Sequence, residues 1–156
     1  MKASAPGKIV ISGAYAVLEG APAIASAVDR FVVADTAGVA ARPTPEVLAA
    51  LGGAPAPAFD ASALFSGDKK LGLGASAAIL VASLAARAVA ERGPLSDLEL
   101  ATAVFPNALR AHALAQGGGS GVDVAAAAFG GTIVFRRGGE RPEALATKLP
   151  PELTVL

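Results

Sequence analysis

The segment from residue 75 to residue 92 is the feature that most restricts how this chain can fold. It contains strong helix formers throughout, is apolar nearly all round until Arg87, and stops at Gly93 and Pro94. A helix without a polar face is predicted to be buried. At 156 residues and 53% hydrophobic, the chain is long enough to build a substantial core and too short for two ordinary domains. We therefore predict one domain, residues 1–156, that contains a buried helix.

The apolar character of the chain does not indicate a membrane protein. Mean hydropathy is +0.55, but alanine supplies much of it. The stretch from Leu71 to Ala86 is too short and too rich in glycine to span a bilayer. The amino terminus lacks an uninterrupted apolar block followed by a cleavage site. We expect a soluble, cytoplasmic protein.

Charge and composition exclude several classes of partner. Thirteen basic residues balance 13 acidic ones, so no net field favours nucleic acid or an anionic membrane. Only 4% of residues are aromatic, which leaves few side chains to stack on bases. The absence of cysteine excludes disulfides, thiolate metal sites and cysteine nucleophiles, and the single histidine makes a histidine-built metal site improbable. The expected partners are therefore small molecules.

The order of the predicted elements indicates an α+β fold rather than a parallel, doubly wound sheet. Ser96 and Glu99 fit a capping box, so a helix begins near Asp97, and Pro106 is expected to kink or divide it before it continues to Gln116. The region from residue 37 to residue 65 is rich in alanine and proline, and the pattern assigns it no function. The remaining predicted elements are strands at Ile9 to Ile11, Tyr15 to Leu18, Ala23 to Val28, Phe31 to Asp35 and Thr132 to Arg136, and helices at Pro45 to Leu51 and Val124 to Phe129.

The segment KKLGLGASAAILVAS is a glycine-rich turn that runs directly into the long helix. Glycines let a backbone approach an anion closely, and the free amides of a helix start favour phosphate. Lys69 and Lys70 add positive charge, and the Ser76 hydroxyl could donate to a phosphate oxygen or ligate magnesium. The alternative is that Gly72 and Gly74 only shape a loop before a core helix.

The segment GGGSGVDVAAAAFGG places one carboxylate, Asp123, among glycines at a helix start. In an otherwise apolar surrounding, this carboxylate could accept a proton. The alternative is an N-cap aspartate with no part in catalysis. The third segment, SAPGKIVISGAYAVLEG, carries Lys8 after a Pro-Gly turn, where its side chain could reach a phosphate or simply lie in solvent.

In order and character, these three segments resemble those of the GHMP kinases. That family has an opening PGK segment, then a GLGSSAA-type phosphate loop, then an SGVD segment with the catalytic aspartate, which here read APGKIVISGAYAVLEG, GLGASAA and GSGVDVAAAAFGG. Within the family, the chain is most similar to the phosphomevalonate kinases of the mevalonate pathway. Its GAY replaces the GEH of mevalonate kinases, Val124 replaces their Asn, and the helix before Asp123 has no nearby acid. His112 and Gln116 match the phosphomevalonate subgroup.

The resemblance implies a fold, a reaction and a set of site residues. The fold would be the ribosomal protein S5 domain 2-like domain at the amino terminus of these kinases, and the reaction would convert phosphomevalonate and ATP to diphosphomevalonate and ADP. Asp123 would be the base or would orient the acceptor oxygen, and Lys8 would lie near the transferred phosphate, while Ser120 and Gly121 would contact the acceptor substrate. Ser76 would also ligate the Mg²⁺ that accompanies ATP. The ATP phosphates would be bound by Lys69, Lys70, Gly72, Leu73, Gly74, Ala75 and Ser76.

Two departures from the family pattern matter. Ala75 replaces the first serine of the usual pair, and the family's carboxy-terminal domain is absent from the sequence. The resemblance therefore leaves two hypotheses open: an enzyme that needs a second domain, acting on phosphomevalonate or on mevalonate or another GHMP substrate, and a noncatalytic nucleotide-binding or interaction module. For the chain by itself we expect little activity, and self-association through the surface that the second domain would cover.

Overall fold

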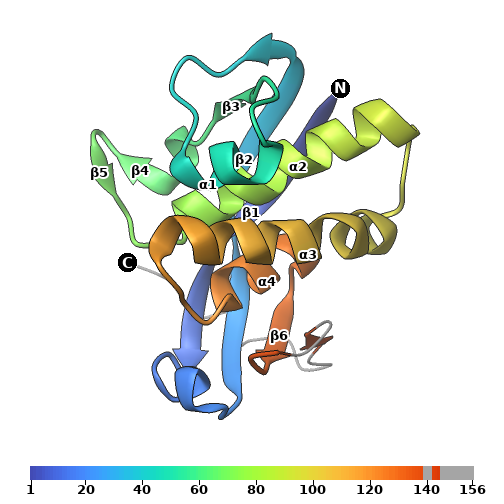
Figure 1. Ribbon diagram of the computed structural model, residues 1–156. Coiled ribbons are helices and arrows are strands. Elements are labelled where there is room, and N and C mark those ends of the chain that lie inside the picture. Colours follow the sequence, from blue (N-terminus) through green and yellow to red (C-terminus); the bar gives the residue numbers. More distant parts are fainter. Residues whose placement is uncertain (139–141, 145–156) are drawn as a thin grey trace.

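Strand β2 (Ala23–Val39) organises the main sheet of the computed structural model, which describes residues 1–138 and 142–144 (Figure 1). One edge of β2 pairs antiparallel with β1 (Lys2–Ser12). The other edge is shared, because β3 (Pro57–Asp60) pairs with the second half of β2 and β6 (Thr132–Phe135) pairs with its first four residues. A short strand β7 (Glu143–Ala144) continues the sheet beyond β6, and β4 (Phe65–Ser66) and β5 (Lys69–Lys70) form a separate hairpin.

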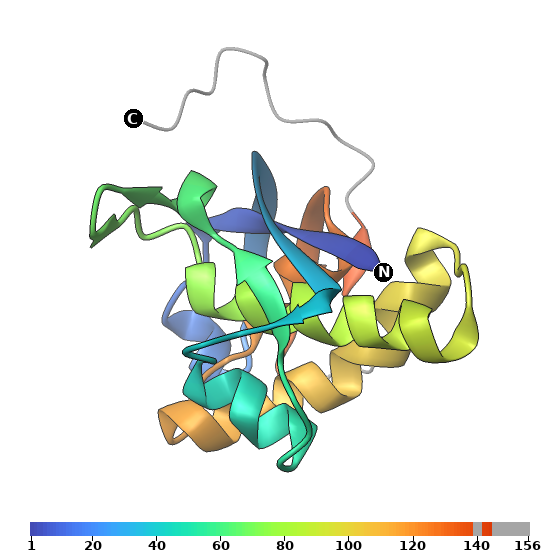
Figure 2. The same cartoon turned by 90° about the horizontal axis from the view of Figure 1, so that it is seen from above.

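The helices lie on one side of this sheet, so the domain has two main layers (Figure 2). Helices α2 (Ala75–Arg92) and α4 (Val122–Phe129) pack against β1 and β2. Helix α3 (Asp97–Gln116) lies across α2 and α4, and α1 (Pro45–Leu51) packs on α3. The predicted α+β class is confirmed.

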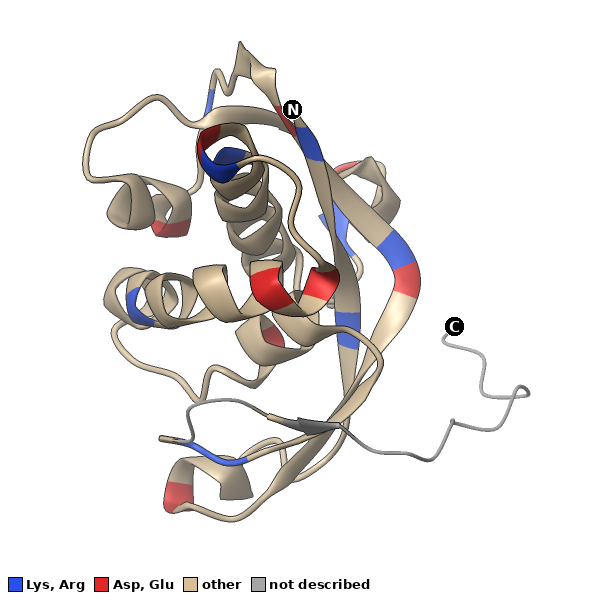
Figure 3. Ribbon diagram, turned by 90° about the vertical axis from the view of Figure 1, so that its right-hand side faces the viewer, with Lys and Arg blue, Asp and Glu red and all other residues tan. Residues whose placement is uncertain are grey.

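Helix α2 is the centre of the core, as its sequence predicts. Its bounds match the predicted ones, and its side chains are buried almost continuously from Ala75 to Ala88. The body of the helix carries no charge, and its charged residues lie near its carboxy-terminal end (Figure 3). Among the described residues, no helix is both long enough and apolar enough to cross a membrane.

Helix α3 begins at the predicted capping box. The Ser96 hydroxyl accepts a hydrogen bond from the Glu99 amide at 3.4 Å, and the Glu99 carboxylate accepts one from the Ser96 amide at 2.9 Å. The expected division at Pro106 is wrong, because the helix continues through it to Gln116. Pro106 and Thr102, whose carbonyl loses its helical donor, are both exposed, so water can replace the missing bond.

One strand predicted near the amino terminus, and one predicted break between strands, are also wrong. Residues 16–19 form a 3-10 helix, η1 (Ala16–Glu19), because Gly13 and Gly20 both adopt left-handed conformations that turn the chain on either side. The strands predicted around Asp29 and Arg30 are one strand, since these two charged residues are exposed and interrupt the apolar pattern without breaking the extended backbone. A second 3-10 turn, η2 (Ser62–Leu64), connects β3 to β4.

An aromatic pair fixes α4 against α3. The rings of Phe105 and Phe129 lie 5.3 Å apart in an edge-to-face arrangement. Phe129 is the last residue of α4, and Asp123 lies in the first turn of the same helix. The packing that holds the two helices together therefore also fixes the position of that carboxylate.

Candidate functional site

The glycine-rich loop leads into α2 with no side chain over the helix end. Gly72 and Gly74 both have positive φ angles, of 76° and 75°. Gly74 is the N-cap of α2 and no side chain accepts a hydrogen bond from the first turn. The first amides of the helix, at the positive end of its dipole, are therefore left for an anion.

Lys8 reaches this loop through two close backbone approaches. The β1 register shifts between Pro6 and Lys8, and the amide of Lys8 donates a hydrogen bond to the Leu73 carbonyl at 2.8 Å. A Cβ added at Gly7 would lie 2.9 Å from the same carbonyl oxygen, and one added at Gly74 would lie 3.0 Å from Lys8 Cγ and Cε. Glycine at both positions therefore lets β1 and the loop meet, with the Lys8 side chain passing directly over Gly74.

Asp123 lies inside the first turn of α4 rather than at its cap. The N-cap is Gly121, with a φ of 82°, and it makes no side-chain capping bond. The interpretation of Asp123 as an N-cap residue is therefore wrong. An added Cβ at Gly121 would overlap Leu109 of α3, so this glycine permits the close packing of α3 on the loop before α4. Ser120 accepts a hydrogen bond from the Val122 amide at 3.3 Å, which closes that turn.

One cavity of about 220 Å³ brings the three sequence motifs together. Two of its lining residues are cationic, Lys8 and Lys70, and one, Asp123, carries a carboxylate. Such a site can bind a polyphosphate through backbone amides and cations while a carboxylate faces the same space. The lining residues are Lys8, Lys70, Gly72, Leu73, Gly74, Ala75, Ser76, Ala77, Gln116 and Asp123.

The cavity wall lacks some of the predicted site residues and contains residues that were not predicted. Lys69 is exposed on β5, and neither it nor Ser120 or Gly121 is among the residues that line the cavity. Gln116 lines the cavity, although its sequence context gave it no role. The signal that could have found it is the glycine run after it, which returns the chain from the end of α3 to Asp123.

Among the described residues, protein side chains by themselves do not form a complete metal-binding site. Within the described residues, no cluster of three or more His, Cys, Asp or Glu side chains could hold a metal ion. The cavity does offer the Ser76 hydroxyl and the Asp123 carboxylate, which are oxygen ligands of the kind that Mg²⁺ takes when it shares its coordination with a nucleotide. The residues therefore fit a magnesium ion carried by ATP.

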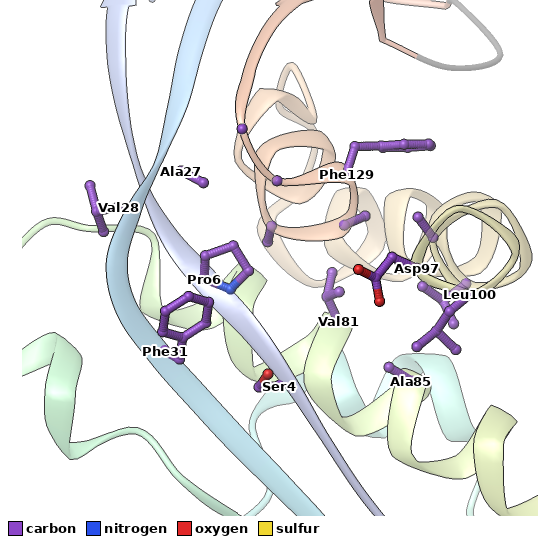
Figure 4. Close-up of a pocket in the computed structure, with 16 residues that line it drawn as sticks. Ser4, Pro6, Ala27, Val28, Phe31, Val81, Ala85, Asp97, Leu100 and Phe129 are labelled. Atoms are coloured by element: carbon purple, nitrogen blue, oxygen red, sulfur yellow. The ribbon is translucent and has the colours of Figure 1, made fainter. Parts of the chain in front are cut away.

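A larger cavity, of about 300 Å³, lies between the sheet and the helices but does not suit a phosphate (Figure 4). Its wall is largely apolar, with Pro6, Phe31 and Phe129 among its lining residues. Its one ionisable side chain is the carboxylate of Asp97. With no lysine or arginine to offset that charge, this cavity suits a phosphate less well than the smaller one does.

Solved structures share this architecture. The chain is similar to the Lin0012 protein from Listeria innocua, with a TM-score of 0.68, 22% identity, and coverage of 87% of this chain and 48% of that one. It is also similar to the mevalonate kinase of Methanococcus jannaschii, with a TM-score of 0.66, 17% identity, and coverage of 94% and 56%. A third similar structure is Streptococcus pneumoniae phosphomevalonate kinase in complex with phosphomevalonate and AMPPNP, with a TM-score of 0.65, 20% identity, and coverage of 90% and 50%.

The fold is that of the amino-terminal half of GHMP kinases. The chain spans about half the length of these solved structures. No protein-family model and no curated protein sequence matches it. The likeness to GHMP kinases therefore rests on the three-dimensional arrangement, together with the motifs that line the cavity.

Proposed function

We propose that this chain is the ATP-binding half of a phosphomevalonate kinase-like enzyme. The reaction would transfer the γ-phosphoryl group of ATP to a phosphate oxygen of phosphomevalonate, giving diphosphomevalonate and ADP. The activity is proposed for the chain together with a second domain, corresponding to the other half of the solved structures that it resembles.

One observation carries this proposal: Lys8, the glycine loop, Ser76 and Asp123 line a single cavity. These residues come from β1, from the start of α2 and from the start of α4, so the fold brings together positions that lie far apart in the chain. Phosphoryl transfer depends mainly on positioning and on neutralising charge, and this cavity supplies groups for both.

Each residue of the cavity has a proposed role. The amides of the glycine loop and of the first turn of α2 bind the β- and γ-phosphates of ATP, with Lys70 adding positive charge. Lys8 neutralises the charge that develops on the transferred phosphoryl group, and Asp123 orients the attacking acceptor oxygen or accepts its proton when it carries one. Mg²⁺, when bound with ATP, neutralises phosphate charge, and Ser76 and Asp123 are the residues that would hold it. For Lys69, Ser120 and Gly121, contact with ATP or the acceptor stays a prediction.

Phosphomevalonate is the preferred acceptor because of positions that distinguish the subgroups of the family. The GAY sequence at residues 13–15 and Val124 after Asp123 both follow the phosphomevalonate kinase pattern. The helix before Asp123 carries no acidic residue in its last three turns, and its buried polar residue is His112 instead. Mevalonate is the first alternative substrate.

A coupled assay of ADP release tests the proposal on the protein that contains both this chain and its second domain. Mevalonate, phosphomevalonate, homoserine and galactose are compared as acceptors, each with and without Mg²⁺. We expect Mg²⁺-dependent ADP release with phosphomevalonate well above that with the other three compounds. Tight ATP binding without acceptor-dependent ADP release for any compound would show instead a noncatalytic nucleotide-binding module.

A further inference from the structure

Glu46 is a buried carboxylate outside the motifs that define the site. It lies in the first turn of α1 and is only 6% exposed. Its Oε1 accepts a hydrogen bond from Gln116 Nε2 at 3.2 Å, which joins α1 to the last residue of α3. Burying a carboxylate costs free energy unless it is hydrogen-bonded, and the bond from Gln116 offsets part of that cost. Apolar side chains would join the two helices without that cost, so the carboxylate calls for another explanation.

The surroundings of Glu46 keep its carboxylate ionised. Burial by itself raises its pKa, but hydrogen bonds from its own backbone amide, from Gln116 and from Thr44 outweigh burial and lower the pKa below 4.5. The neighbouring His112, which is 3% exposed, acts in the same direction. An ionised carboxylate only accepts hydrogen bonds, so the amide nitrogen of Gln116 must face it.

Gln116 connects this buried charge to the phosphate cavity. Its side chain lines the cavity together with Ser76 and Asp123. Among the described residues, its carboxamide makes one hydrogen bond, the one to Glu46. With the nitrogen held by Glu46, the carbonyl oxygen is the carboxamide atom with both acceptor positions free for a ligand.

We propose that Glu46 is a positioning residue that holds the Gln116 carboxamide so that its carbonyl oxygen accepts a hydrogen bond from a non-reacting hydroxyl of the acceptor substrate. This inference rests on the proposed function. It gives the Ala/Pro-rich region 37–65 a role, because α1 then supports the wall of the site from behind. It also assigns Gln116 to acceptor selection, since a fixed carbonyl oxygen favours a hydroxyl and disfavours a second anionic group at the same place.

Steady-state kinetics of the two-domain protein test this inference. The variants are Glu46→Gln, Gln116→Met and the double variant, and Asn107→Ala is the matched control. Asn107 also joins α3 to α1, through a hydrogen bond from its Nδ2 to the Ala50 carbonyl at 3.3 Å, but it does not line the phosphate cavity. Urea unfolding of each variant identifies any that fail to fold. Gln116 is an exposed residue at a helix end, so we expect Gln116→Met to fold even if Glu46→Gln does not.

We expect Gln116→Met to raise KM for phosphomevalonate by about threefold to tenfold, the loss of one neutral hydrogen bond. KM for ATP should stay unchanged. Glu46→Gln should raise the same KM, and the double variant should show no more than the effect of Gln116→Met, because both changes remove one interaction. Asn107→Ala should leave both constants at the wild-type values.

Two outcomes overturn the inference, and they can be told apart. If the wild type turns over phosphomevalonate and both Glu46→Gln and Gln116→Met keep the wild-type KM for it, the positioning role is overturned. The proposed function then remains intact. No phosphomevalonate-dependent turnover by the wild type overturns the proposed function, and the inference with it.

Discussion

Gly74 is the residue of the glycine-rich loop over which the Lys8 side chain passes. Its φ of 75° is one that other residues avoid, and an added Cβ would lie 3.0 Å from two carbons of Lys8. We expect Gly74→Ala to weaken binding of the magnesium complex of an ATP analogue by about tenfold or more, because Lys8 has to move, and to lower the free energy of unfolding by about 1–2 kcal/mol. Calorimetric titration and urea unfolding measure the two effects.

Gly67→Ala is the control that separates the two effects expected of Gly74→Ala, backbone strain and displacement of Lys8. Gly67 also has a positive φ, of 58°, but no atom lies within 4 Å of its added Cβ. This control should lose a similar amount of stability and keep its affinity for the nucleotide. Equal loss of affinity in both variants would contradict the role given to the contact between Gly74 and Lys8.

Asp123 is expected to act on the chemical step and not on nucleotide binding. In the two-domain protein, Asp123→Asn should lower kcat by about 10²-fold to 10⁴-fold, because it removes the charge and the proton acceptor beside the acceptor oxygen. Affinity for the ATP analogue should change little. Asp29→Asn, which alters an exposed carboxylate on β2, is the control for kcat. Near-normal turnover by Asp123→Asn would remove this residue from the mechanism.

Two serines on α2 allow a matched comparison. Ser76 lines the phosphate cavity, whereas Ser83 is fully buried and its Oγ has no hydrogen-bond partner among the described residues. We expect Ser76→Ala to weaken binding of the magnesium complex of an ATP analogue about tenfold, the loss of one hydrogen bond to a charged group. Ser83→Ala should leave affinity unchanged and maintain or raise stability. Equal nucleotide affinity of Ser76→Ala and the wild type, measured by calorimetry, would place Ser76 outside the site.

Among single residues, the sequence predicted a place in the candidate site for side chains that lie within recognisable motifs. Lys8, Ser76 and Asp123 each belong to such a segment, and the structure brings all three to one cavity. Glu46 and Gln116 were not assigned a role, because their relation depends on how α1 packs on α3. A contact between residues 70 positions apart leaves no local pattern in the chain.

Among the elements, the start of α3 offers a test of pH dependence. Hydrogen bonds from the Ser96 hydroxyl and amide lower the pKa of Glu99 from its usual 4.5. A carboxylate with a lowered pKa in the folded state stabilises the protein above its unfolded pKa, and that stability is lost as pH falls through the folded value. Glu99→Ala should therefore be less stable than the wild type at about pH 7, and the difference should shrink below 4.5.

Urea unfolding of the two proteins across this range of pH measures the effect. Glu91→Ala is the control, since Glu91 pairs with Arg87 on the exposed side of α2 and takes no part in the capping box. A difference between Glu99→Ala and the wild type that stays constant down to about pH 3 would mean that the capping box adds no charge-dependent stability.

Helices α1, α2 and α4 were predicted within two residues because their signals are local. The apolar run of α2 and the glycines that end all three helices act within a few residues of the element. The strands were predicted less well, and the errors have a common cause. A charged pair such as Asp29 and Arg30 suggests the end of a strand in sequence, but β2 continues through both exposed residues, between the part that pairs with β6 and the part that pairs with β3.

For the whole molecule, we predict that residues 1–156 by themselves show little kinase activity and self-associate. Donor, acceptor and metal must be held together for phosphoryl transfer, and the chain covers about half of the kinase structures that it resembles in fold. Exposed apolar side chains such as Tyr15, Phe31 and Val39 favour association. ADP release and sedimentation velocity, compared between this chain and the two-domain protein, check both parts. Comparable turnover by a monomeric chain would show that this half is sufficient.

The shared edge of β2 also bears on how the protein reaches its folded state. Strands β1 and β3 pair with β2 from nearby in the chain. The pairing of β6 with β2 instead joins residues 106 positions apart, such as Ser26 and Thr132, whose hydroxyl oxygens lie 3.0 Å from each other. Closing so long a loop is entropically costly and comes after local pairing. Helix α4 lies directly before β6 in the chain, so we expect Asp123 to reach the cavity that Lys8 also lines when β6 pairs with β2. We therefore expect the contact between Lys8 and the glycine-rich loop to form before Asp123 joins the cavity, so that the complete site is among the later parts of the domain to form.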